Sequence, residues 1–146
     1  VRSREADHAA THVGKSSGLA TLLRGTLPLA AKRQCYLPGD LMMEYGLSQE
    51  SLYRGEPSEA LNDVVFKCAT TAKAHLDHAR ELRASVPRAA LPVLLPALGA
   101  GAHLTALEEA QFDVFDPRLA PGSRAGAMRQ LKLQGLIAWH AWRETY

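Results

Sequence analysis

The sequence has few of the features that mark several protein classes by composition alone. Its two cysteines, Cys35 and Cys68, lie far apart in no C-x-x-C pattern, which argues against a disulfide framework and a thiolate zinc site. Aromatic residues make up 6% of the chain, and the formal net charge is only +2. Such a charge does not indicate a polyanionic partner, although a role on RNA stays open.

Long apolar runs and targeting signals are also missing. No run approaches eighteen consecutive apolar residues, so we predict no membrane span. Neither a secretory signal nor an Arg-rich transit peptide is present. Composition therefore gives no location for the protein.

The apolar residues recur at helical spacing, which predicts an all-α fold. The clearest helix begins at Ser58 and runs to about Ala84. Its expected core stripe is Leu61, Val64, Val65, Cys68, Ala72, Leu76, Ala79 and Leu82. We expect shorter helices at about 40–45, 102–112 and 124–145, and a proline-kinked core helix over 89–98 that Gly99 and Gly101 end.

A helix and a loop make up the stretch His12 to Pro38, around which the chain is organised. The apolar spacing predicts a helix from about Ala6 to Arg24, which Pro28 is expected to stop. Residues 25–38 show no strand alternation and contain many turn and basic residues. We predict that they form a loop.

Two histidine pairs lie at helical spacing. His8 and His12 are one turn apart, as are His75 and His78, and either spacing suits a transition metal. No third ligand at helical spacing completes either pair, since Cys68 lies too far along the helix axis from the second. We therefore expect one of His8 and His12 to face solvent and the other to cap or pack. We interpret His75 and His78 as surface or border histidines and predict no metal site.

Two further groups have competing interpretations. Asp113 and Asp116 lie in a connector rich in turn residues, and the proline after Asp116 favours a turn over a Mg²⁺ site.

Trp139 and Trp142 share one face of the last helix. They either complete the core, which is the default interpretation, or form an exposed anchor for a partner protein.

One region resembles a known family. The sequences Leu22-Leu23-Arg24 and, after a loop, Tyr36-Leu37-Pro38 resemble the second signature region of squalene and phytoene synthases, which are all-α head-to-head prenyltransferases. In that family two aspartates at D-x-x-x-D spacing follow the arginine and hold Mg²⁺ against a diphosphate. This sequence has Gly25 and Leu29 at those positions, and neither side chain can ligate the ion.

The resemblance also bears on the neighbouring polar residues. Catalytic members place a Gln and an Asn just before the arginine, where this sequence has Gly18 and Thr21. What remains of a diphosphate site is Arg24, Lys32 and Arg33. The resemblance thus implies a retained isoprenoid-synthase bundle, lost chemistry, and no metal or cofactor.

A narrower resemblance is to the non-catalytic mitochondrial branch of the family, the complex I assembly factors. It rests on the order and spacing of four segments, which are 7–15, Gly46 to Glu50, 112–117 and Trp142 to Tyr146. A complete member would have a comparably long helical region before Val1, so we expect 1–146 to be the C-terminal part of the domain. The chain is then a fragment, a processed piece or half of a split protein.

This resemblance implies a structural function with protein partners. The leading hypothesis is an inactive assembly factor or structural subunit of a large mitochondrial complex, respiratory complex I first, in the matrix or on the matrix side of the inner membrane. A separate chain carrying the N-terminal half is one expected partner. The alternatives are a mitochondrial ribosome subunit, an active head-to-head prenyltransferase, and a prenyl-diphosphate binder.

Overall fold

The fold is built from helices alone in the part of the chain that the structure describes. The structure is a computed structural model that describes residues 3–120 and 122–143. The α-helices are α1 (Arg4–Ala30), α2 (Gly39–Glu44), α3 (Gln49–Tyr53), α4 (Glu59–Glu81), α5 (Pro96–Glu109) and α6 (Arg124–Arg143). Two 3₁₀ helices, η1 (Leu82–Ser85) and η2 (Arg88–Leu94), separate α4 from α5. The predicted all-α class is confirmed.

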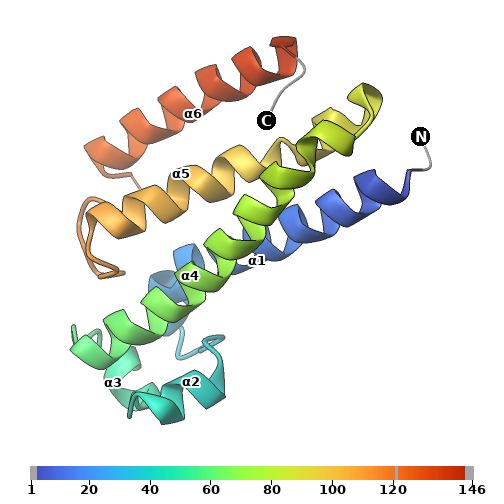
Figure 1. Ribbon diagram of the computed structural model, residues 1–146. Coiled ribbons are helices and arrows are strands. Elements are labelled where there is room, and N and C mark those ends of the chain that lie inside the picture. Colours follow the sequence, from blue (N-terminus) through green and yellow to red (C-terminus); the bar gives the residue numbers. More distant parts are fainter. Residues whose placement is uncertain (1–2, 121, 144–146) are drawn as a thin grey trace.

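The long helices α1 and α4 form the centre of the molecule. They pack against each other along much of their length, α5 packs on α1 and α4, and α6 lies along the outer side of α5 (Figure 1). The short helices α2 and α3 gather at one end of this bundle. One apolar core joins these helices, and α6 contributes no buried residue to it.

Helix α4 forms as its sequence predicts. The Ser58 side chain accepts a hydrogen bond of 3.2 Å from the backbone N–H of Leu61, which satisfies one free amide of the first turn. Seven of the eight stripe residues are buried, from Leu61 to Ala79, and Leu82 is partly buried. Ser48 caps α3 in the same way, through the N–H of Ser51.

Helix α1 is longer than predicted, and residues 25–30 are not a loop. Pro28 lies inside the helix and removes one backbone hydrogen bond, to the carbonyl of Arg24. Thr26 and Ala30 are buried on the face that also carries Leu23, and their packing outweighs that single loss. The helix ends at Ala30, and a turn over residues 31–33 follows, in which Arg33 has a positive φ of 56°.

Helix α5 also differs from the prediction. A 3₁₀ segment, η2, replaces the kinked helix, and Gly99 and Gly101 lie inside α5 rather than at a helix end. A Cβ atom on Gly101 would lie 3.3 Å from an Arg80 nitrogen and 3.4 Å from a Leu76 methyl. Gly101 therefore serves as the point of close approach between α5 and α4.

The segment Arg88–Glu109 is apolar enough for a membrane span by length and composition alone. Its most apolar window has a mean hydropathy of 1.6 and is 44% buried inside the molecule. A buried core helix meets the same criterion, and Leu91, Leu94 and Leu107 of this segment belong to the core. The absence of a membrane span stays a prediction.

We predict that Leu76→Ala lowers the free energy of unfolding by about 2–5 kcal/mol, because it opens a cavity between α1, α4 and α5. Leu76 is only 1% exposed. Urea unfolding followed by circular dichroism measures this change. Lys67→Ala is the control, since Lys67 is exposed on the same helix, and its effect should stay within about 0.5 kcal/mol. Equal effects of the two substitutions would contradict this account of the core.

Candidate functional site

The face of α1 that resembles the second synthase signature carries no metal ligand at the two key positions. A Cβ atom added to Gly25 would lie 3.2 Å from the Cδ1 atom of Leu29, so the two positions are adjacent on one helical face. Two carboxylates at these positions would point the same way and could share a cation. Glycine and leucine cannot, and this face has no ligand for Mg²⁺ at either position.

The three basic residues of the predicted diphosphate remnant contact different parts of the molecule. Arg24 lines a small cavity together with His103 of α5. Arg33 donates a hydrogen bond of 2.9 Å to Glu50, and its guanidinium lies 5.2 Å from the centre of the Tyr53 ring. Lys32 is exposed just beyond the end of α1. The fold therefore turns Arg24 toward α5 and Arg33 toward α3.

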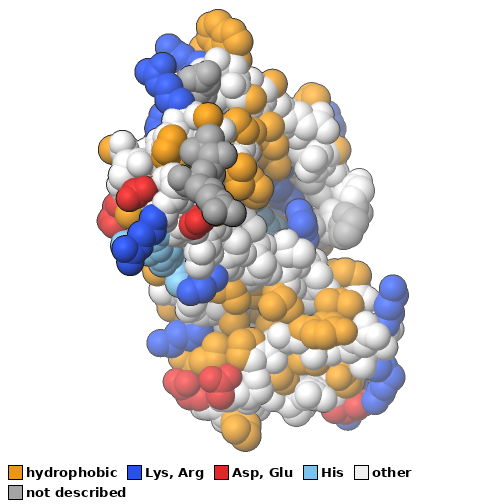
Figure 2. Space-filling model, turned by 90° about the vertical axis from the view of Figure 1, so that its right-hand side faces the viewer, with side chains coloured by type: hydrophobic (Ala, Val, Ile, Leu, Met, Phe, Trp, Pro, Cys, Tyr) orange, Lys and Arg blue, Asp and Glu red, His pale blue; other side chains and the backbone are white. Residues whose placement is uncertain are grey.

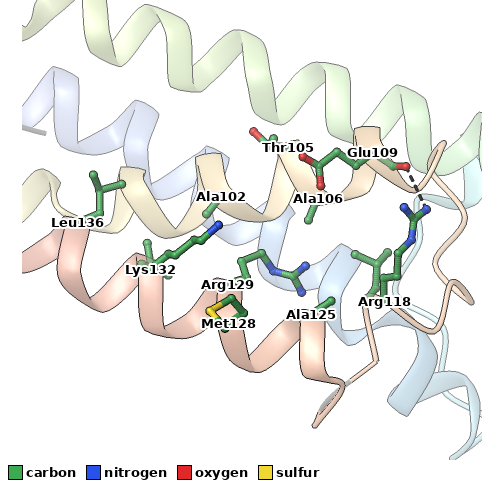
Figure 3. A pocket seen from close by; sticks show the side chains of 12 residues that line it. Ala102, Thr105, Ala106, Glu109, Arg118, Ala125, Met128, Arg129, Lys132 and Leu136 are labelled. Atoms are coloured by element: carbon green, nitrogen blue, oxygen red, sulfur yellow. Dashed lines mark hydrogen bonds between the residues drawn. The ribbon is translucent and has the colours of Figure 1, made fainter.

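A groove of about 540 Å³ runs between α5 and α6 (Figure 3). Ala102 and Ala106 of α5 and Met128 and Leu136 of α6 supply apolar walls. Figure 3 shows three basic side chains in the groove, with the Arg118 guanidinium donating a hydrogen bond of 3.1 Å to the Glu109 carbonyl. The other two are Arg129 and Lys132. The sequence did not predict this groove, because the residues of α5 were expected to belong to two separate helices, 89–98 and 102–112.

Helix α6 has a large exposed apolar surface. Trp139 is 52% exposed and Trp142 is 75% exposed, so the interpretation of these residues as core is wrong, and their role as an anchor for a partner stays a prediction. Their ring centres lie 5.7 Å apart. Figure 2 shows hydrophobic side chains at the upper end of the molecule, where α6 lies. The other large exposed apolar residues of the helix are Met128, Leu131 and Leu136.

The acidic pair of the connector builds turns, as the sequence indicates. Asp113 accepts a hydrogen bond of 2.8 Å from the N–H of Phe115. Asp116 pairs with Arg118 at 2.6 Å, and hydrogen bonds from this arginine lower the pKa of the Asp116 carboxyl. Both carboxylates thus have local partners. In the last segment of the narrower resemblance, Trp142 to Tyr146, residues 144–146 lie outside the described residues.

The histidine pairs lie at the border of the α1–α4 contact. His8 is exposed, and His12, His75 and His78 are half-buried. The predicted border position of His75 and His78 is confirmed. The fold also brings both pairs together, which the spacing within each helix does not reveal. The prediction of no metal site rested on the spacing within each helix, and the joining of the two pairs removes that ground.

Comparison with known proteins gives a family and a set of relatives. The squalene/phytoene synthase family model matches residues 1–125. The mouse (Mus musculus) protein named NADH dehydrogenase (ubiquinone) complex I, assembly factor 6 is 34% identical over all 146 residues, 42% of its own length. The rat (Rattus norvegicus) protein of that name is 38% identical over 119 residues, 82% of this chain and 36% of its own length.

A Drosophila melanogaster homolog of assembly factor 6 is 39% identical over 114 residues, which are 77% of this chain and 34% of that protein. The chain thus spans less than half the length of these relatives. No solved structure gave a significant match.

His103 should make the stability depend on pH. Burial, assisted by the charges of Arg24 and Arg129, lowers the pKa of His103 from 6.5 to about 4. Below pH 6.5 the unfolded chain therefore binds a proton that the folded chain does not, and stability falls as the pH drops toward 4. We expect the titration of His103 to lower the free energy of unfolding by about 2 kcal/mol between pH 7 and pH 5.

Urea unfolding at both pH values, with wild type and His103→Gln, measures this contribution. The variant has no titratable group at this position, so its stability should fall by about 2 kcal/mol less than that of the wild type over the same interval. An equal pH dependence in the two proteins would show that His103 titrates normally in the folded state.

Proposed function

This chain belongs to the squalene/phytoene synthase family, and we propose that it acts as a non-catalytic assembly factor of respiratory complex I. The observation that carries the proposal is the alignment of the whole chain with assembly factor 6 of mouse, at 34% identity. Bovine (Bos taurus) assembly factor 6 aligns over the same full length. The comparisons favour neither the catalytic nor the ribosomal alternative.

The α1 face supports a non-catalytic function. Gly25 and Leu29 lie side by side where two carboxylates would have to hold the metal. Arg24 and Arg33 contact different helices, so the basic residues do not compensate for the missing ion at one place. Binding of a diphosphate by Arg24, Lys32 and Arg33 stays a prediction.

Helix α6 is the part of the chain that we propose docks the partner. The synthase family model ends at residue 125, whereas the alignment with the mouse assembly factor includes all of α6. The helix therefore belongs to what this chain shares with assembly factors beyond the synthase region. Its exposed tryptophans are of the residue type that carries much of the binding energy at protein interfaces.

The charge of α6 indicates the chemistry of that partner. Between Arg124 and Arg143 the helix has four Lys or Arg residues and no Asp or Glu, and Arg129 and Lys132 line the groove beside it. We propose that the partner is a protein of complex I assembly that presents an apolar segment flanked by acidic residues. The proposed location is the mitochondrial matrix or the matrix side of the inner membrane.

The length of the relatives bears on which part of the family domain this chain represents. We propose that residues 1–146 correspond to the C-terminal part of the family domain. The support for this is the share of the mouse protein that the chain spans, which is 42%.

Depletion of the protein followed by native gels of mitochondrial membranes tests the assembly function. We expect assembled complex I to fall and its intermediates to accumulate, while the other respiratory complexes stay at their normal level. Re-expression of the wild-type protein should reverse the defect. Normal complex I after depletion would overturn the proposal.

Substitution of the exposed tryptophans tests the docking surface. We predict that Trp139→Ser and Trp142→Ser together fail to restore complex I and weaken partner capture by at least about 30-fold, the effect of losing one hot-spot residue of about 2 kcal/mol, since the contributions of neighbouring hot spots do not add in full. Their exposure predicts a change in unfolding free energy within about 0.5 kcal/mol. Capture is measured by mass spectrometry of proteins that co-purify with the tagged chain.

Met43→Ser is the matched control, since Met43 is an 81% exposed apolar residue on α2. It should restore complex I fully. Equal rescue by the control and the tryptophan variant would exclude α6 as the docking surface. Co-purification of a second chain that matches the rest of the relatives, lost in the tryptophan variant, would show instead that α6 packs against the family's own fold.

Restoring the two carboxylates tests the non-catalytic part of the proposal. We predict that neither the wild type nor Gly25→Asp combined with Leu29→Asp releases diphosphate from prenyl diphosphates in the presence of Mg²⁺. The variant stays inactive because Gly18 and Thr21 are unchanged. Turnover by the wild type would contradict a non-catalytic function, and turnover by the variant alone would show that only the metal ligands had been lost.

A further inference from the structure

Four histidines from two helices meet at the contact between α1 and α4. The Nε2 atoms of His8 and His12 lie 3.2 Å apart, and the Nδ1 atoms of His12 and His75 lie 3.0 Å apart. The ring centre of His78 lies 4.4 Å from that of His12 and 5.6 Å from that of His8. The two pairs therefore form one cluster, although 63 residues separate His12 from His75 along the chain.

Three of these rings offer nitrogen atoms at distances that suit one metal ion. Ligand atoms of His8, His12 and His78 all lie within 4.8 Å of one another. Around a tetrahedral zinc ion with Zn–N bonds of about 2.0–2.1 Å, neighbouring nitrogens lie about 3.3 Å apart. The separation of 3.2 Å between His8 and His12 already has this value, and a small side-chain rotation would bring in His78.

Neighbouring side chains leave the required nitrogens available. The Nδ1 atom of His12 pairs with His75, so the Nε2 atom is the one directed toward His8. The Nδ1 atom of His78 lies 3.4 Å from a carboxylate oxygen of Glu81, which leaves its Nε2 atom for a metal. A second partner on the opposite ring nitrogen is the usual arrangement of histidines that bind metals.

The surroundings also favour the neutral form of the central ring, which is the form that binds metals. Burial is the main cause that lowers the pKa of His12, and the charges of His78, His75, His8 and Lys15 lower it further. The Glu81 carboxylate adds a negative charge beside His78 that would offset part of the charge of a cation.

From this geometry we propose that His8, His12 and His78 bind a divalent transition metal ion, zinc first, and that His75 positions His12. Three imidazole nitrogens with an open fourth position are a common zinc ligand set. Water fills the fourth position, since His8 lies at the surface. Figure 2 shows histidine atoms at the surface beside basic and acidic side chains.

This site is separate from the α1 face that carries Gly25 and Leu29. His12 precedes Gly25 by 13 residues, which is about 20 Å along a helix. The donors are imidazoles from two helices rather than carboxylates, so the ion would be a borderline metal and not Mg²⁺. Bound there, it would join the first turns of α1 to the last turns of α4.

Zinc titration of the metal-free chain against a chromophoric chelator tests the proposal. We expect one zinc ion per chain, and about 100-fold weaker binding in His8→Gln, which keeps its fold because His8 is exposed. The double variant His12→Gln with His78→Gln should lose the site. His75→Gln should weaken binding by about 10- to 100-fold, as expected for a residue that only positions a ligand.

His103→Gln is the matched control, because His103 lies on α5 away from the cluster. It should bind zinc as the wild type does. Cobalt in place of zinc should give the intense visible absorption of a four-coordinate site in the wild type and lose it in His8→Gln. Absence of stoichiometric zinc binding by the wild type, or unchanged affinity in both the His8 and the double variant, would overturn the proposal.

Discussion

The packing of α1 against α4 is the interaction on which the rest of the structure depends. Leu61, Val64 and Val65 of α4 are completely buried, as is Ala9 of α1, so the two helices meet through small and branched apolar side chains. Helix α5 can join this pair closely because Gly101 has no side chain where it meets α4. The core, the α1 face and the histidine cluster are all placed by this one helix pair.

The sequence predicted those elements whose signals are local. The start at Ser58 and the apolar stripe that follows it predict α4 almost residue by residue. Pro28 and Gly101 misled the prediction, because tertiary packing keeps each residue inside a helix that it would weaken in isolation. The histidine cluster depends on which faces of two distant helices meet, and one sequence does not contain that information.

Two surfaces of the bundle bear on its proposed function, the α1 face with Gly25 and Leu29 and the exposed face of α6. Gly25 and Leu29 lie side by side on α1, and neither side chain can ligate a metal ion. Helix α6, by contrast, has large apolar side chains that the described part of the chain leaves open. Packing and catalysis use different residues, so a fold can keep its core whatever side chains stand at a catalytic position.

The attachment of α6 has a consequence for the dynamics of the molecule. None of its described residues is buried, so breaking its contacts with α5 would open no cavity among α1, α4 and α5. Local opening of this kind requires much less free energy than global unfolding. The free energy needed to detach α6 is therefore set by its surface contacts with α5 and not by the packing of the core.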